Sequence, residues 1–339
     1  MKTNRIAMVD LIKWIASLFV ILIHCTFYGG FGVSVKAIAR FAVPFFFLST
    51  GYFLYGSSPD RLLKKLRRIL GLAISAFLLY FIFFAVATAV QKGVTGLWDF
   101  LADFTDLEKL GRFLAFNVPF SFTNLWYLFA VVYVYLLYYA LTKCKASDKL
   151  IFSLGAVLLL VHLLLWQMCL SLQLTTNTFY VRNFLFFGFP MVMAGAFLKK
   201  HQQKLPRMSG VLLVLLALTS ALLSIASRWM LGNKSLPVGA ILLAVSLFVY
   251  AIQCRPGKAQ RLLPKAGVYS TYIYILHPCV IRLVQIVAQR CGLPQKSPIW
   301  INTMPIIVVT VTVLLAVAVC AVKEKVCSIA DRRKTLQTK

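Results

Sequence analysis

Residues 6–28 read IAMVDLIKWIASLFVILIHCTFY, an apolar run that only Asp10, Lys13 and His24 interrupt with ionisable side chains. One helix needs about 20 apolar residues to cross the hydrocarbon core of a membrane. Asp10 and Lys13 argue against a cleaved signal peptide, and no small-residue cleavage site follows the run. The stretch therefore predicts a membrane-spanning helix that retains three ionisable groups.

These three ionisable side chains share one face of the predicted helix. At about 100° per residue, Lys13 and His24 lie within roughly 20° of each other around the axis, and Asp10 is about 40° away. Charged groups inside a membrane face a cavity or a partner helix, because exposure to lipid is costly. Lys13 and His24 are about 16–17 Å apart along the axis, so we expect them to act at separate depths, with His24 in the outer half. The alternatives are an i,i+3 ion pair of Asp10 with Lys13 and a histidine satisfied by a neighbouring helix.

The composition indicates that the whole chain, and not this stretch alone, belongs to a membrane protein. Of its 339 residues 60% are apolar and 13% charged, against about half and a quarter in soluble domains, and the mean hydropathy is +0.83. A soluble enzyme is excluded, and 14% aromatic residues exclude a disordered chain. We expect an all-α, polytopic membrane protein with about ten transmembrane helices. The nine further apolar runs cover residues 38–55, 69–90, 125–141, 150–170, 184–198, 210–227, 238–252, 269–288 and 305–322.

The charges predict the orientation of these helices. The net charge is +27, and 24 Lys and Arg residues fall in the segments that lie inside if the amino terminus is cytoplasmic, against nine outside. This bias predicts both termini in the cytoplasm and an even number of helices. Because the charges lie between apolar runs, nucleic acid is not an expected partner; the bilayer is. Residues 1–322 form the predicted transmembrane domain, and residues 323–339 a short basic cytoplasmic tail.

The cysteines and the longest connection between apolar runs also allow predictions. The eight cysteines show no CxxC pair and no Cys/His spacing for zinc, so we expect no metal site and no disulfide framework. The longest connection, residues 91–124, holds four acids between apolar residues at near-helical spacing. This pattern predicts an interfacial helix on the outer membrane surface, either a solvated loop helix or a contact for an acceptor.

Short motifs give the chain a resemblance to a known family. The segment from Val9 to Ala16, followed by His24, resembles the opening signature of the membrane-bound acyltransferase-3 family, with Lys13 where Arg is usual. Lys keeps the charge but lacks the planar fork of Arg. Later segments resemble the family's motifs in the same order, with Thr50 and Lys65 replacing the usual Ser and Arg. They are RFAVPFFFLSTGY (residues 40–52), KKLRRI (64–69), LWYL (125–128) and YIYILHP (272–278).

The resemblance implies a bacterial inner- or plasma-membrane O-acyltransferase. Such an enzyme moves an acyl group, commonly acetyl, from cytoplasmic acyl-CoA to a hydroxyl of a surface glycan or lipid-linked acceptor. His24 would act as general base or as a transient acyl carrier, and Arg40 would stabilise the oxyanion or orient the acceptor. The residues expected to bind the CoA donor are Lys13, Lys64, Lys65, Arg67, Arg68 and His277, and those expected to bind the acceptor are Asp10, Trp126 and Tyr127.

Several of these residues have simpler alternative roles. The basic residues also fit positive-inside anchoring, Arg40 an interfacial arginine, and Trp126 with Tyr127 an interfacial aromatic belt. His277, expected nearer the cytoplasm than His24, also fits a structural histidine beside Pro278. The main functional alternative is a transporter or flippase for a small polar solute, which has no need to bind acyl-CoA. A purely structural or signalling membrane protein would not need the buried ionisable stripe.

Overall fold

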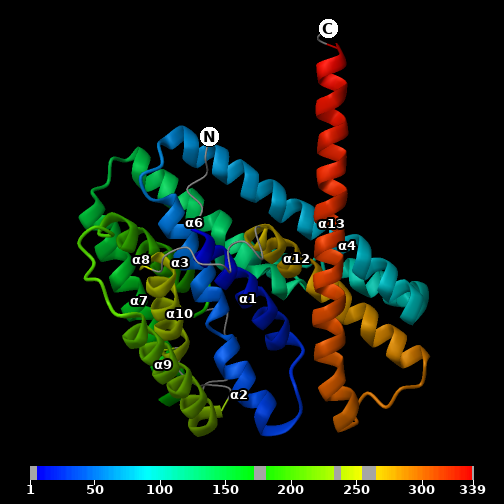
Figure 1. Cartoon of the computed structure of the whole chain (residues 1–339). Coiled ribbons are helices and arrows are strands. Elements are labelled where there is room, and N and C mark those ends of the chain that lie inside the picture. The colour runs from blue at the N-terminus through cyan, green and yellow to red at the C-terminus, as the bar shows by residue number, and fades with distance from the viewer. Residues whose placement is uncertain (1–5, 172–180, 233–237, 254–264, 338–339) are drawn as a thin grey trace. The chain divides into compact units, whose positions relative to one another are not determined.

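The computed structural model describes residues 6–171, 181–232, 238–253 and 265–337. Within these ranges all regular structure is helical and no strand occurs (Figure 1), which confirms the all-α expectation. The chain divides into two compact units, Met1–Ala42 with Cys254–Lys339, and Val43–Gln253. Each unit is described by itself.

The first unit combines both ends of the chain. α12 packs against α1 and against α13, and Ile21, Ile273 and Val308 from these three helices form its fully buried core. At its amino-terminal end α12 is tied to α13 by an ion pair between Lys265 and Glu324 of 2.7 Å. The helices of this unit are α1 (Ala7–His24), α2 (Gly29–Ala39), α12 (Ala266–Arg290) and α13 (Pro298–Gln337).

The helix α13 is longer than a membrane requires. Its 40 residues extend for about 60 Å, roughly twice the thickness of a bilayer core. It runs without a break through the predicted end of the membrane domain at residue 322 (Figure 1). The basic segment expected as a tail therefore continues the last helix as far as Gln337.

The second unit holds the middle of the chain. α9 packs along α10, α4 along α6, and α7 along α8. α4 contains one residue with non-helical geometry, Gly93, at φ 70°, close to the predicted end of the third span. Its elements are α3 (Ala42–Leu54), α4 (Pro59–Ala102), α5 (Leu107–Phe116), η1 (Thr123–Leu125), α6 (Trp126–Lys143), α7 (Asp148–Ser171), η3 (Phe184–Gly188), α8 (Phe189–Lys200), α9 (Gly210–Leu231) and α10 (Val238–Gln253).

The structure supports a multi-pass membrane protein. Among the described residues, eight helical segments are long and apolar enough to cross a membrane. All ten predicted runs fall on helices, and eight of them lie in these segments. The other two fall on α10, which has 16 residues, and on α8, which has 12. α8 is short because a π-helical turn, η3, precedes it and because it ends at its two lysines, Lys199 and Lys200.

Two glycines bring α3 and α8 into backbone contact. A Cβ atom added to Gly51 would lie 1.7 Å from the carbonyl oxygen of Val192, and one added to Gly195 would lie 1.9 Å from that of Leu48. Small residues allow helices in membranes to approach closely, where apolar side chains alone give little attraction over lipid. This contact fixes α3, which carries part of the second family-like motif.

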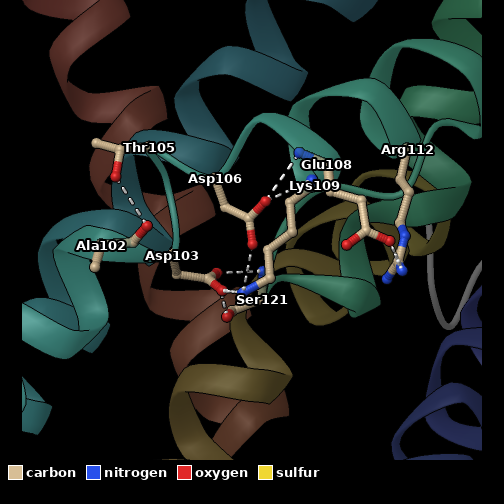
Figure 2. A network of polar contacts seen from close by, with 8 residues as sticks. All are labelled: Ala102, Asp103, Thr105, Asp106, Glu108, Lys109, Arg112 and Ser121. Carbon is tan, nitrogen blue, oxygen red and sulfur yellow. Dashed lines mark hydrogen bonds and ion pairs between the residues drawn. The ribbon is translucent and has the colours of Figure 1, made fainter.

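The predicted interfacial helix is divided by a turn. α4 ends at Ala102, and Asp106 starts α5 by accepting hydrogen bonds from the backbone N–H groups of Glu108 (2.9 Å) and Lys109 (3.2 Å). Figure 2 shows Asp103, in the turn, bound by the Lys109 ammonium and by Ser121. Burial opposes ionisation of Asp103, but Lys109 and Ser121 outweigh it and hold its pKa below the ordinary value. Sequence periodicity missed this turn because an aspartate cap interrupts the apolar pattern only locally.

Candidate active site

The first unit brings two histidines together. His24 is the last residue of α1 and is exposed, whereas His277 lies within α12 and is fully buried. Their ring centroids are 5.4 Å apart, and the ring planes make an angle of 31°. The chain thus presents one accessible imidazole that rests against a second, buried one.

The relative direction of α1 and α12 explains the contact between His24 and His277. Near the start of both helices, a Cβ added to Gly267 would lie 2.6 Å from a carboxylate oxygen of Asp10. Further along both helices, His24 meets His277. The two helices therefore run parallel, as expected for the first and ninth of ten alternating spans.

The expected difference in depth between His24 and His277 is wrong. We expected His277 about eight residues into its helix and nearer the cytoplasm than His24. α12 begins at Ala266, earlier than the apolar run indicated, so His277 lies near the middle of that helix. Its parallel packing with α1 then places the two rings side by side.

Pro278 helps to fix the orientation of the His277 ring. Proline has no N–H, so it leaves the carbonyl four residues earlier without its helical hydrogen bond. That carbonyl belongs to Tyr274, and the Nδ1 atom of His277 lies 2.8 Å from it. Because a carbonyl only accepts, Nδ1 donates the hydrogen, and Nε2 of the neutral ring keeps its lone pair. Among the described residues, Nε2 has no hydrogen-bond partner.

Asp10 and Lys13 lie together at the other end of α1. The Lys13 ammonium is 3.8 Å from the Asp10 carboxylate, and both side chains are about one-fifth exposed, at 22% and 19%. The i,i+3 ion pair left open as an alternative is therefore present. Asp10 also lies against Gly267 in the first turn of α12, where the positive end of the helix dipole favours a carboxylate.

Arg40 lies at the joint between α2 and α3. We expected it to begin the second membrane helix, but α2 precedes it, and Arg40 is the residue that ends α2. The next residue, Phe41, packs edge-on against Phe19 of α1 with ring centroids 5.5 Å apart. Apolar periodicity missed α2, because its three glycines, its serine and Lys36 weaken the apolar run.

The basic residues at the start of α4 differ in their surroundings. Lys64, Arg67 and Arg68 are exposed. Lys65 is half-buried, and its ammonium donates to the carbonyl of Phe53 at 2.6 Å and to the Ser57 hydroxyl at 2.8 Å. Since Phe53 is in the last turn of α3, where helix carbonyls are commonly satisfied from outside the helix, Lys65 caps that helix. Its assignment to the CoA donor stays a prediction.

Trp126 and Tyr127 begin α6 within an aromatic cluster of the second unit. The ring of Phe47 from α3 is 4.8 Å from that of Tyr127 and 6.1 Å from that of Trp126. The Arg182 guanidinium lies over the Trp126 ring, 4.9 Å from its centroid. Sequence reasoning assigned Arg182 no role, because nothing local links it to a tryptophan 56 positions earlier.

The predicted site residues are therefore distributed as follows. The first unit contains the histidine pair, the Asp10–Lys13 pair and Arg40. The second contains the basic residues of α4 and the aromatic residues of α6. The roles of these residues in donor and acceptor binding stay predictions.

An exposed imidazole supported by a buried one, on parallel membrane-spanning helices, defines a multi-pass membrane protein with a candidate general base. A family model described as an acyltransferase domain, acyltransferase 3, matches residues 6–324, almost the whole chain. The chain belongs to this family and is a membrane acyltransferase. No curated protein and no solved structure matches the chain.

Proposed function

We propose that this acyltransferase moves an acyl group, with acetyl as the expected case, from cytoplasmic acyl-CoA to a hydroxyl of a cell-surface glycan or lipid-linked acceptor. The observation that carries the proposal is the contact between His24 and His277, whose centroids are 5.4 Å apart. An accessible imidazole is suited to general-base catalysis because it ordinarily titrates near neutral pH. The predicted location is a bacterial cell membrane.

In the direct route His24 removes the proton of the acceptor hydroxyl as its oxygen attacks the thioester carbonyl. The new C–O bond forms, the C–S bond breaks, and the CoA thiolate leaves. The proton then passes from His24 to the thiolate, which yields the ester and free CoA. His277 acts as a positioning residue, since its buried ring packs against that of His24.

The donor is expected to bind through its phosphates. Lys and Arg side chains form strong charge-assisted hydrogen bonds with phosphate, and Lys64, Arg67 and Arg68 are exposed at the start of α4. Arg40 is proposed to stabilise the developing oxyanion, as preorganised cationic groups do in acyl transfer. Lys13 stays a candidate donor contact and Asp10 a candidate acceptor contact. His277, which we expected at the donor, is fully buried and is proposed to position His24 instead.

The test is acyl transfer by membranes that contain the full chain and radiolabelled acetyl-CoA. In His24→Ala we expect the transfer rate to fall by about 10²–10⁴-fold, the usual contribution of a general base. The matched control is His201→Ala, because His201 lies after α8, in the other unit from His24, and its ring packs on Phe197 in its own turn.

Two results would contradict the proposal. Wild-type transfer in His24→Ala, at equal expression, would remove His24 as base. A protein that accumulates a polar solute in vesicles but neither binds nor consumes acyl-CoA would instead support the transporter alternative.

A further inference from the structure

Arg182 is a cation in contact with an aromatic ring and, within the described part of the chain, not with an acid. It is exposed, and its guanidinium carbon lies over the half-buried Trp126 ring, 4.9 Å from the ring centroid. Among the described side chains no carboxylate pairs with it. A guanidinium in cation–π contact with a ring can still donate its N–H groups, and carboxylate and phosphate accept two of them side by side.

The backbone on both sides of Arg182 is held by buried polar side chains. Nδ1 of His162 donates to the carbonyl of Val181 at 2.9 Å. The Asn183 side chain accepts from the backbone N–H groups of Leu185 (2.9 Å) and Phe186 (3.0 Å). His162 and Asn183 are 0% and 1% exposed. Such buried hydrogen bonds are expensive to break, so the backbone that carries Arg182 is held in place before any ligand binds.

A third buried side chain connects this segment to Trp126. Asn117 is 1% exposed; its Oδ1 accepts from the backbone N–H of Phe184 at 2.7 Å, and its Nδ2 donates to the carbonyl of Trp126 at 3.0 Å. One amide thus joins the segment that carries Arg182 to the residue that carries its ring partner. This arrangement differs from an interfacial arginine that reaches towards headgroups on a free stem.

We propose that Arg182 and Trp126 form a subsite that binds an anionic group of the acceptor, either a carboxylate or a phosphate on a sugar. The guanidinium edge binds the anion, and the Trp126 ring borders the sugar. The assignment of this subsite to the acceptor rests on the proposed function. It predicts that the acceptor is an anionic glycan rather than a neutral one. A phospholipid headgroup carries the same anionic chemistry and is the alternative that the experiment must separate.

The experiment measures binding to the full chain in nanodiscs of neutral phosphatidylcholine. The probes are methyl glucuronoside and glucose 6-phosphate, with methyl glucoside as the neutral comparison. We expect at least one anionic probe to bind about tenfold or more tightly than methyl glucoside, as a charge-assisted contact provides. In Arg182→Gln this preference should disappear, and in Arg182→Lys it should weaken, because Lys keeps the charge without the planar fork.

The controls separate this subsite from a folding defect and from the catalytic proposal. Arg112→Gln removes another guanidinium, one that pairs with Glu108 on α5, and should keep the preference. The thermal unfolding midpoint of Arg182→Gln should match that of the wild type. His24→Ala should still prefer the anionic probe, so a failure of the proposed base would leave the anion binding measurable.

Three results would overturn the subsite. The first is equal binding of all three probes by the wild type. The second is an unchanged preference in Arg182→Gln. The third is loss of the preference when the nanodiscs contain phosphatidylglycerol, which would assign Arg182 to a lipid headgroup.

Discussion

At the scale of single residues, Pro278 shows how one proline inside a helix can orient the side chain before it, that of His277. A residue with an N–H at this place would donate to the Tyr274 carbonyl and would compete with the His277 ring for that acceptor. With proline, Nδ1 of His277 lies 2.8 Å from the carbonyl. The ring that supports His24 is thereby fixed in one tautomer and one orientation.

Replacing this proline tests the arrangement directly. In Pro278→Ala the restored N–H competes for the Tyr274 carbonyl, and we expect acyl transfer to fall about ten- to hundredfold, a loss typical of small misplacements at a reacting centre. The thermal unfolding midpoint should stay equal or rise, because the helix gains a hydrogen bond and loses a proline. Pro305→Ala, the equivalent change inside α13, should keep wild-type transfer. A Pro278→Ala variant with full activity would contradict the positioning role of His277.

At the scale of elements, the crossing of α3 and α8 depends on the absence of side chains at Gly51 and Gly195. The atoms that a Cβ would meet are backbone carbonyl oxygens, which cannot move aside as a flexible side chain can. α3 carries Phe47, which packs on both aromatic residues of α6. A change in this crossing would therefore propagate to the aromatic cluster beneath Arg182.

We expect Gly195→Ala to destabilise the protein by about 1–3 kcal/mol, the usual range for inserted atoms in a packed contact. The measurement is the thermal unfolding midpoint of the purified chain in detergent. Gly71→Ala serves as the control, because Gly71 lies within α4 and a Cβ there meets no atom within 4 Å. This variant should be as stable as the wild type or more so, since alanine favours a helix over glycine. Equal stability of the two variants would show that the crossing tolerates a side chain.

At the scale of the whole molecule, the charge distribution and the parallel packing of α1 and α12 agree on the topology. Parallel helices in a membrane require an odd number of spans between them, and seven of the ten predicted runs lie between these two. The positive-inside bias then predicts cytoplasmic ends for both termini. The exposed cysteines Cys144, Cys291 and Cys327 lie on different predicted sides of the membrane. Cys291 is predicted outside, and Cys144 and Cys327 are predicted in the cytoplasm.

Single-cysteine variants test this topology with a maleimide that cannot cross membranes. Cys291 should react in intact cells, whereas Cys144 and Cys327 should react only after the membrane is permeabilised. Cys25, which is buried, is the negative control in folded protein. Reaction of Cys144 in intact cells would reverse the predicted orientation.

The sequence by itself determined the membrane-spanning helices and most of the ionisable groups they carry, although not α2 or the turn before α5. Apolar runs and a net charge of +27 specify membrane helices and their direction, because every backbone polar group in lipid must be satisfied within its own segment. The order of the short motifs indicated the family, and the family model over residues 6–324 confirmed it.

Only the tertiary structure decided which of these groups meet. His24 and His277 are more than 250 positions apart, and their contact depends on where α12 starts and how it packs against α1. The stacking of Arg182 on Trp126 likewise depends on a buried asparagine from a third segment. Periodicity describes one helix at a time, whereas these contacts arise from packing between helices, where a shift of one turn moves a side chain by about 5 Å.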